Sequence, residues 1–250
     1  MLSNEGPLPL KRVEEQYRGL IYPWGRLEHP EEVPFEVAPG VWWLRFTMPG
    51  PLNHINLWLL EDGDGWTIVD TCLNLETAKA HWESLFNGFM GEKPVKRVIC
   101  THMHPDHIGL AGWLCERFAC DLYMTQAEFL TGSLIMGYTG EQAPPAAISF
   151  YHRAGFSTSQ LDNYRDRFGG FGQFTTPLPH NYQRLTDRQT LAIGGRYWQI
   201  VVGEGHSPEH ACLYCPALQL VIAGDQILPR ITPNVSVFPT QPDGNPLEAW

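Results

Sequence analysis

The run THMHPDH at residues 101–107 follows directly after the apolar segment 98–100, and it constrains the fold more than any other part of the chain. An apolar strand is expected to turn into a helix here, which places several nitrogen and oxygen atoms around one point. Imidazole and carboxylate groups suit zinc, and they also suit iron and manganese. A lone histidine carries little information, whereas an H-x-H-x-D-H cluster after a strand predicts a metal site. The candidate ligands in this run are His102, His104, Asp106 and His107.

Apolar segments bounded by turn residues predict the strands around this run. Strands are expected at residues 41–46, 55–60, 66–69, 95–100 and 121–124, with a hairpin at the EDGDG turn of residues 61–65. Helices are expected at residues 75–86, where the apolar residues share one face, and at residues 108–118. Further strands are expected at residues 190–193, 198–202, 211–214 and 218–223.

Residues 125–185 interrupt this alternation and are rich in aromatic side chains. Helices are expected there at residues 126–136, 146–154 and 159–168. The whole pattern predicts an α/β (α+β) fold, in which two mixed β-sheets pack together with helices outside. We expect a single domain over residues 1–250, with an N-terminal arm at residues 1–36 and a helical insert at residues 125–185.

The composition of the chain excludes some classes of partner and location. The formal net charge of −10 argues against nucleic acid as a partner, because phosphate binding needs a basic surface. The N-terminus lacks the pattern of a signal peptide, and the apolar stretches are too short to span a membrane. Six scattered cysteines then favour a reducing cytoplasm over a disulfide scaffold. The C-x-x-C pair Cys212 and Cys215 lies in an expected strand, where residues three apart point to opposite faces, so both are interpreted as core residues.

Three further motifs follow expected strands and, with the first, produce a resemblance. These are IVDT at residues 68–71, GHSP at residues 205–208 and AGD at residues 223–225. Their order and their placement at strand ends resemble the metallo-β-lactamase superfamily from about residue 37 to residue 225. The resemblance implies the αββα sandwich of that family and a hydrolase similar to glyoxalase II and the lactonases.

The resemblance also implies roles for individual residues. His102, His104 and His206 would bind a first metal ion. Asp106 and His107 would bind a second, and Asp225 would bridge the two. Asp70 would support the metal-binding loop through hydrogen bonds, because ligand orientation depends on such partners. One or two zinc ions per chain are the expected cofactors, with iron and manganese as alternatives.

The chain departs from the family pattern at three places. Cys72 stands where glycine is common, and Glu209 also replaces a frequent glycine, with His210 beside it interpreted as structural. The family's last histidine ligand, which follows the bridging aspartate, has no counterpart in the 25 residues after Asp225. We therefore expect an incompletely liganded second position and a sequence cut short of the full protein.

These roles predict a hydrolase that uses a metal-bound hydroxide on an ester, thioester or lactone of a partly apolar small molecule. Asp106 is the candidate catalytic residue, which would orient the nucleophile or move a proton. One alternative is a mononuclear iron thiol dioxygenase of the same fold, since two histidines and one aspartate also suit non-haem iron. Another is a non-catalytic ligand-binding module. A homo-oligomer is compatible with all three.

The insert is expected to cover the metal cleft. Its aromatic side chains have two compatible interpretations, the insert's own core and a roof over an apolar part of the substrate. Five isolated histidines are not expected to bind metal: His29, His54, His81, His152 and His180. Of these, His180 is the preferred candidate for a substrate contact.

Overall fold

The computed structural model describes residues 15–23, 33–50 and 53–250. The expected arm at residues 1–36 therefore lies largely outside the described residues, as does His29. Its described part contains a short hairpin, β1 (Glu15–Tyr17) and β2 (Leu20–Tyr22), and the start of the next strand. None of the helices described is both long and apolar enough to cross a membrane.

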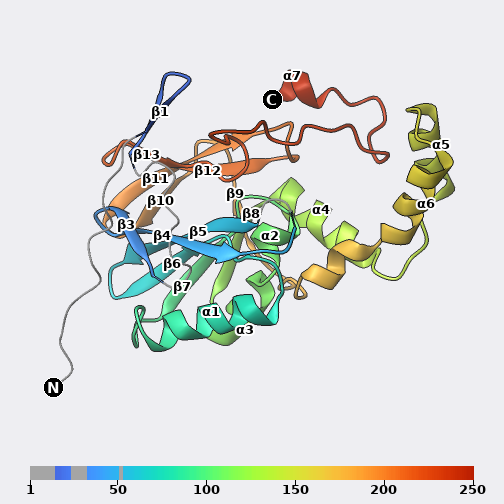
Figure 1. The fold of residues 1–250 in the computed structure, drawn as a ribbon. Helices are drawn as coiled ribbons and strands as arrows, with labels where there is room; N and C mark the ends of the chain where they lie inside the picture. The colour runs from blue at the N-terminus through green and yellow to red at the C-terminus, as the bar shows by residue number, and fades with distance from the viewer. Residues whose placement is uncertain (1–14, 24–32, 51–52) are drawn as a thin grey trace.

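A seven-stranded mixed sheet forms the first half of the molecule (Figure 1). Its strands lie in chain order: β3 (Phe35–Ala38), β4 (Val41–Thr47), β5 (His54–Asp62), β6 (Gly65–Val69), β7 (Val95–Ile99), β8 (Asp121–Thr125) and β9 (Gln183–Leu185). The pairs from β3 to β6 are antiparallel, and those from β6 to β9 are parallel. The carboxyl ends of β6, β7 and β8 therefore lie at one edge of the sheet, where Asp70 and the 101–107 run begin.

A four-stranded sheet packs against one face of the first. It contains β10 (Thr190–Ile193), β11 (Arg196–Gly203), β12 (His210–Cys215) and β13 (Leu220–Ile222), and every pair is antiparallel. Leu60 and Ile99 from the first sheet share a buried cluster with Trp198 from the second. Apolar burial of this kind contributes about 25 cal/mol per Å², which holds the sheets together.

Helices cover the opposite face of the seven-stranded sheet. They are α1 (Glu76–Asn87), α2 (Pro105–Ile108) and α3 (Ala111–Phe118). Trp82 on α1 is buried in the core, and its indole N–H donates to the carbonyl of Thr71. The single helix expected at residues 108–118 is two helices, because the backbone departs from helical angles at Leu110 and packs closely against Cys72 at Gly109. A Cβ atom there would lie 2.4 Å from the carbonyl oxygen of Cys72, so only glycine allows this approach.

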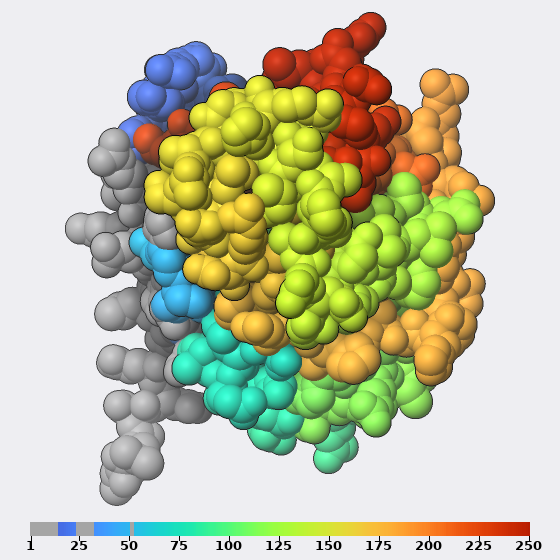
Figure 2. Space-filling view, turned by 90° about the vertical axis from the view of Figure 1, so that its right-hand side faces the viewer, coloured from blue at the N-terminus to red at the C-terminus, as the bar shows by residue number. Residues whose placement is uncertain are grey.

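The insert contains three helices and a short 3-10 helix. They are α4 (Gln126–Gly137), α5 (Pro145–Arg153), α6 (Thr158–Arg167) and η1 (Gly170–Phe174). Helices α5 and α6 project from the body in Figure 1 and occupy much of the face seen in Figure 2 (yellow). Residues 183–185, which we assigned to the insert, are strand β9 of the seven-stranded sheet. Strand β9 pairs with β8, so the insert leaves and re-enters the sheet at its edge.

The expected α/β (α+β) fold class is confirmed, with two refinements. The first sheet is mixed, whereas the second is antiparallel throughout. Within residues 186–250, all of which are described, the one helix is the four-residue α7 (Pro246–Ala249). Among the residues that the structure describes, an outer helical layer is therefore present on the first sheet and not on the second. Five of the residues from 229 to 246 are prolines, which disfavour a longer helix there, because proline lacks the N–H group that a helix interior needs.

Candidate metal centre

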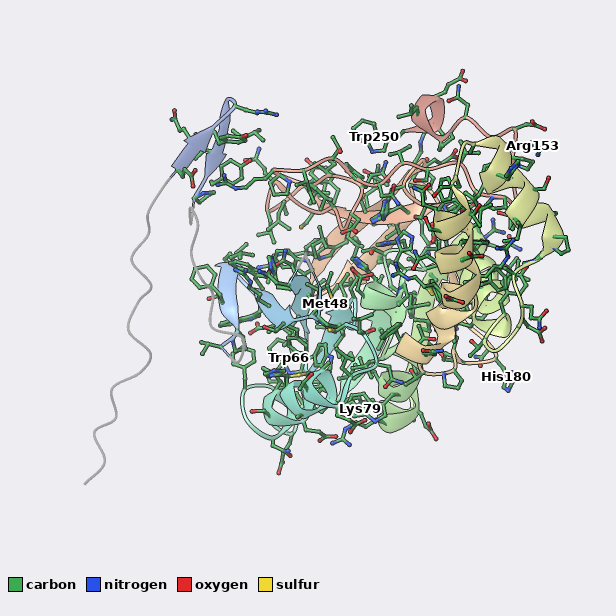
Figure 3. All side chains as sticks on the ribbon, turned by 45° about the vertical axis from the view of Figure 1, so that its right-hand side comes forward. Met48, Trp66, Lys79, Arg153, His180 and Trp250 are labelled. Carbon is green, nitrogen blue, oxygen red and sulfur yellow. The ribbon has the colours of Figure 1, made fainter. Side chains whose placement is uncertain are left out.

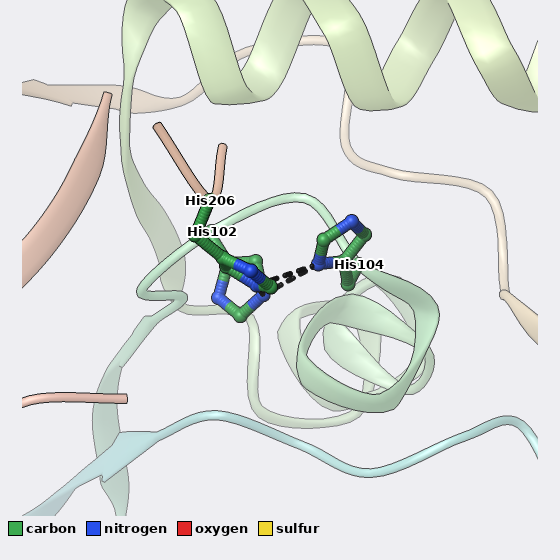
Figure 4. A group of neighbouring side chains, drawn as sticks. All are labelled: His102, His104 and His206. Carbon is green, nitrogen blue, oxygen red and sulfur yellow. Dashed lines mark hydrogen bonds between the residues drawn. The ribbon is translucent and has the colours of Figure 1, made fainter. Parts of the chain in front are cut away.

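Three histidine nitrogens converge between the two sheets (Figure 4). His102 Nε2 lies 2.8 Å from His104 Nδ1, His104 Nδ1 lies 3.1 Å from His206 Nε2, and His206 Nε2 lies 3.2 Å from His102 Nε2. Donors about 2.0–2.1 Å from one tetrahedral ion are roughly 3.4 Å apart, so this triangle is close to the size that one cation requires. His102 and His206 are buried, and the loop after β7 and the loop before β12 position them.

A second group of donors lies beside the first. The Nε2 atom of His107 is buried without a hydrogen-bond partner, 3.6 Å from Asp106 Oδ2 and 3.5 Å from Asp225 Oδ1. The other oxygen of Asp225, Oδ2, lies 3.6 Å from His206 Nε2. Asp225 therefore stands between the two groups. A buried polar atom without a partner is costly, and a cation between these three residues would satisfy it.

The electrostatics of the site also suit a cation. Burial, together with neighbouring histidines, lowers the pKa of His104 to about 4 and that of His102 well below its usual value. Both rings are then neutral at pH 7, as metal ligands must be. Burial opposes charge on His107, but the carboxylates of Asp70 and Asp106 outweigh it and raise its pKa well above the usual value. The site therefore favours positive charge at His107 Nε2, which a bound cation would supply.

Asp70 holds the first loop from the end of β6. Its carboxylate accepts hydrogen bonds from the Thr101 backbone N–H at 2.8 Å and from Thr101 Oγ1 at 2.9 Å. It also lies 2.8 Å from His107 Nδ1. A carboxylate can only accept, so Nδ1 carries the ring proton and Nε2 is left free for a metal. Asp70 adopts a left-handed φ of 62°, which directs its side chain under the loop.

The second loop and the bridging aspartate have supports of their own. His206 Nδ1 donates to the carbonyl of Asn234 at 2.9 Å, which leaves Nε2 for a metal. His210 is buried, and its Nε2 accepts the backbone N–H of Asp225 at 3.1 Å. Gly224 allows this contact, because a Cβ atom at that position would lie 2.6 Å from His210 Nε2. His210 thus sets the backbone position of Asp225 and keeps the structural role expected of it.

The comparison with known families decides the identity of this fold and site. The sequence profile described as the metallo-beta-lactamase superfamily matches residues 50–250. The chain belongs to the metallo-beta-lactamase superfamily. All six residues proposed as ligands lie within this matched region, and the structure brings them together around two adjacent points.

Individual known proteins resemble this chain over different lengths. A beta-lactamase domain protein from Burkholderia ambifaria is 40% identical, with a TM-score of 0.80, and the match covers 91% of this chain and 66% of that protein. A probable metallo-hydrolase from Bacillus subtilis strain 168 is 23% identical, over 76% of this chain and 70% of its own length. A linear primary-alkylsulfatase from a Pseudomonas species is 39% identical over 75 residues, which are 30% of this chain and 10% of that protein.

Two of the three departures noted in the sequence, at Cys72 and Glu209, now have structural explanations. Cys72 adopts a left-handed φ of 74°, a conformation that glycine takes without strain. Burial raises the pKa of its thiol to about 12, so Cys72 is no nucleophile at neutral pH. Glu209 accepts the backbone N–H of Ala127 at the start of α4. Cys212 and Cys215 are buried and free, in agreement with the core interpretation.

The isolated histidines lie apart from this centre. The two groups of potential metal donors among the described residues include none of His54, His81, His152 and His180. His180 is exposed and lies at the surface in Figure 3. Sequence reasoning missed three supporting groups: Thr101, the carbonyl of Asn234 and the carboxylate of Glu128. Thr101 directly precedes the motif and could have been suspected, whereas the other two become neighbours only through the fold.

Proposed function

We propose that this chain is a metal-dependent hydrolase, with zinc as its preferred cation, that cleaves an ester, thioester or lactone of a partly apolar small molecule. The observation that carries the proposal is the pair of converging donor groups with Asp225 between them. The imidazoles of His102, His104 and His206 form one group, and His102, His107 and Asp225 form the other, with Asp106 Oδ2 3.6 Å from His107 Nε2. This donor set of nitrogen and carboxylate oxygen suits zinc and leaves positions open for water and substrate.

A bound cation would lower the pKa of a coordinated water towards 7 and polarise the substrate carbonyl. The residues around it perform the remaining tasks. Asp70 and Asn234 keep the ring protons of His107 and His206 on Nδ1, so that their Nε2 atoms face the centre. Asp106 is partly exposed beside His107, and its Oδ2 atom would accept the proton of an attacking water or orient that water.

Thiol chemistry is a poor alternative at this centre. The nearest cysteines in sequence to the metal motifs are Cys72, Cys100 and Cys212, and all three are buried. Burial raises the pKa of each, to about 12 for Cys72 and about 11 for Cys212. A thiol that stays protonated at neutral pH is a weak nucleophile. The attacking group is therefore proposed to be water.

The insert supplies apolar surface close to the centre. Gly132 on α4 lies against Met103, between two metal-binding histidines, because a Cβ atom there would be 3.4 Å from the Met103 Cβ. Leu130 and Leu134 on the same helix are one turn apart and about half exposed, at 55% and 52%. Their spacing from Glu128 and Gly132 places them on the opposite face of α4 from the metal centre, so they do not line the site. The aromatic rings of α5 and α6 instead pack on one another, which favours a structural role for them.

The test combines metal analysis with a substrate panel. Purified protein is analysed for bound metal and assayed on aryl esters, thioesters, lactones and, because of the short match to an alkylsulfatase, primary alkyl sulfates. The expected result is bound zinc and hydrolysis that a chelator removes and added zinc restores. One iron per chain with oxygen uptake on thiol substrates would replace the proposal by the dioxygenase alternative. Metal binding without turnover on any panel member would favour a ligand-binding module.

A further inference from the structure

Glu128, in the first turn of α4, is a fully buried carboxylate. Its partners are a hydroxyl group and two backbone N–H groups. Oε1 accepts from Ser207 Oγ at 2.6 Å and from the Glu209 N–H at 2.8 Å, and Oε2 accepts from the Met103 N–H at 2.9 Å. Burial raises the pKa of Glu128, while these three donors oppose that effect. Burying a carboxylate is costly, so a position that needed only packing would be better filled by an apolar side chain.

The three donors belong to the two loops that carry the histidine triangle. Met103 lies between His102 and His104, and Ser207 directly follows His206. The two loops are distant in the sequence, and the nitrogens of His104 and His206 lie 3.1 Å apart. The carboxylate of Glu128 on α4 therefore accepts hydrogen bonds from both loops, at positions next to their histidines. A change at this point would alter the separation of the histidines without removing any of them.

The connection between α4 and the second loop is reciprocal. The Glu209 carboxylate accepts the Ala127 N–H at 2.9 Å, and the Thr125 hydroxyl donates to the Glu209 carbonyl at 2.8 Å. The start of α4 and the 206–209 loop thus exchange hydrogen bonds in both directions. These two hydrogen bonds fix the distance between the start of α4 and the 206–209 loop. Glu128 can then act as a rigid spacer.

We propose that Glu128 is a positioning residue, which sets the distance between the two histidine loops so that three imidazoles reach one cation. The first helix of the insert is then part of the metal centre. This inference rests on the proposed function, because it concerns the cation that the histidines would hold. It predicts that a variant with all six ligands intact still binds metal poorly.

The decisive variant is Glu128→Gln, which keeps the size of the side chain. Glutamine has one oxygen acceptor and one NH₂ donor. The backbone N–H of one of the two loops would therefore face the NH₂ group of the glutamine, and neither group could accept a hydrogen bond from the other. The expected result is a loss of about 10–100-fold in affinity for Zn²⁺, measured by competition with a chelator, as found for partners of metal ligands in general. The absorption spectrum of the Co²⁺-loaded protein, which reports coordination geometry, should also change.

Asp62→Asn is the matched control. Asp62 is also a buried carboxylate, which accepts from Thr67 Oγ1 and the Gly194 N–H and pairs with Arg97. Asp62 pairs across the sheet with Gly65, the first residue of β6, whereas Asp70 follows the last residue of that strand. This variant should lose stability while it keeps the wild-type Zn²⁺ affinity and Co²⁺ spectrum. Equal affinity losses in both variants, or none in Glu128→Gln, would overturn the positioning role.

A second variant covers the case in which Glu128→Gln does not fold. Ser207→Ala removes one of the three donors and should weaken Zn²⁺ binding by a smaller factor. Where both single variants fold, their losses should not add in the double variant, because they act through the same carboxylate. Additive losses, or no loss in Ser207→Ala when Glu128→Gln fails to fold, would contradict the proposal.

Hydrogen exchange of the metal-free protein tests the same contacts without any cation. The Met103 or Glu209 amide should exchange faster in Glu128→Gln than in Asp62→Asn, and unchanged protection would contradict the proposal. A wild-type protein that binds no cation would refute the proposed function instead. The exchange result would still report whether Glu128 holds the loops.

Discussion

The metal centre and the outer insert, helices α5 and α6, are built in opposite ways. In the centre, directed hydrogen bonds hold the polar groups: the Asp70 carboxylate holds His107, the backbone carbonyl of Asn234 holds His206, and His210 accepts the backbone N–H of Asp225. In the outer insert, most residues are exposed, and the rings around Tyr151 and Tyr164 pack on one another and, through Phe168, on Tyr138 at the end of α4. The hydrogen bonds of the centre fix directions, whereas the ring contacts of the insert fix little beyond proximity.

This difference indicates a division of tasks. Directional bonds place ligand atoms to within a fraction of an ångström, which metal chemistry requires. A peripheral aromatic cluster tolerates changes of shape, in keeping with the structural role that its ring contacts favour. Helix α4 belongs to both regions, because Glu128 contacts the centre while Leu130 and Leu134 are exposed. The comparison therefore predicts large effects at the centre and small effects in the outer insert.

The largest effect is expected from His104→Ala. Removal of one corner of the histidine triangle should abolish Zn²⁺ retention and hydrolysis, a loss beyond the roughly 10–100-fold cost of losing a supporting partner. Cys215→Ser, in the core of the second sheet, should keep both and lose about 1–3 kcal/mol of unfolding free energy. Metal content, activity and thermal unfolding of the two variants test this. Equal losses of activity in His104→Ala and Cys215→Ser would mean that both variants act through stability. That result would contradict the distinction between the metal centre and the rest of the fold.

A smaller, selective effect is expected from Asp70→Asn. The asparagine NH₂ group can donate to His107 Nδ1, which would move the ring proton to Nε2 and block that atom as a ligand. The position formed by His107, Asp106 and Asp225 should weaken by about 10–100-fold, while the histidine triangle keeps its cation. Metal titration of wild type and variant separates the two positions. A variant that loses both cations equally would show that Asp70 supports the whole loop.

The two positions should also differ in the wild-type protein. The imidazoles of His102, His104 and His206 would hold the first cation, whereas the second would depend on His107, Asp106 and Asp225, and its donor group overlaps the first at His102. We expect the second to bind at least about tenfold more weakly, since it lacks the ligands that zinc prefers. Stepwise removal with a chelator, followed by metal analysis, measures the ratio. Two equally tight sites would require a further ligand in the assembled protein.

The smallest effect on the metal centre is expected from Tyr151→Ala. This change removes ring contacts with Phe150, Phe156 and Tyr164, each worth about 1 kcal/mol. Hydrogen exchange should accelerate in α5 and α6, while Zn²⁺ affinity stays at the wild-type value. A change in KM without a change in metal content would assign substrate contact to the outer insert. Loss of metal would instead join the two regions into one unit.

Much of the fold could be predicted because its signals are local. The strands expected at residues 66–69 and 95–100 match β6 and β7 to within one residue, and the apolar face expected at residues 75–86 is the buried face of α1. Strand β9 was missed, because its three residues pair with β8 after a long excursion and show no apolar alternation. The break between α2 and α3 was missed as well, because it depends on the close approach of Gly109 to Cys72.

The sequence by itself determined the family and the identities of the six candidate ligands, because each ligand lies in a short motif at the end of a strand. Only the tertiary structure decided how they meet. Partners distant in the chain fix the ring protons of His107 and His206 on Nδ1 and bring Asp225 between the two donor groups. The hydrogen bonds of Glu128 to the two histidine loops likewise join residues far apart in the sequence. A motif specifies which atoms can bind a cation. The hydrogen bonds that orient those atoms form only when the two sheets and α4 are packed together.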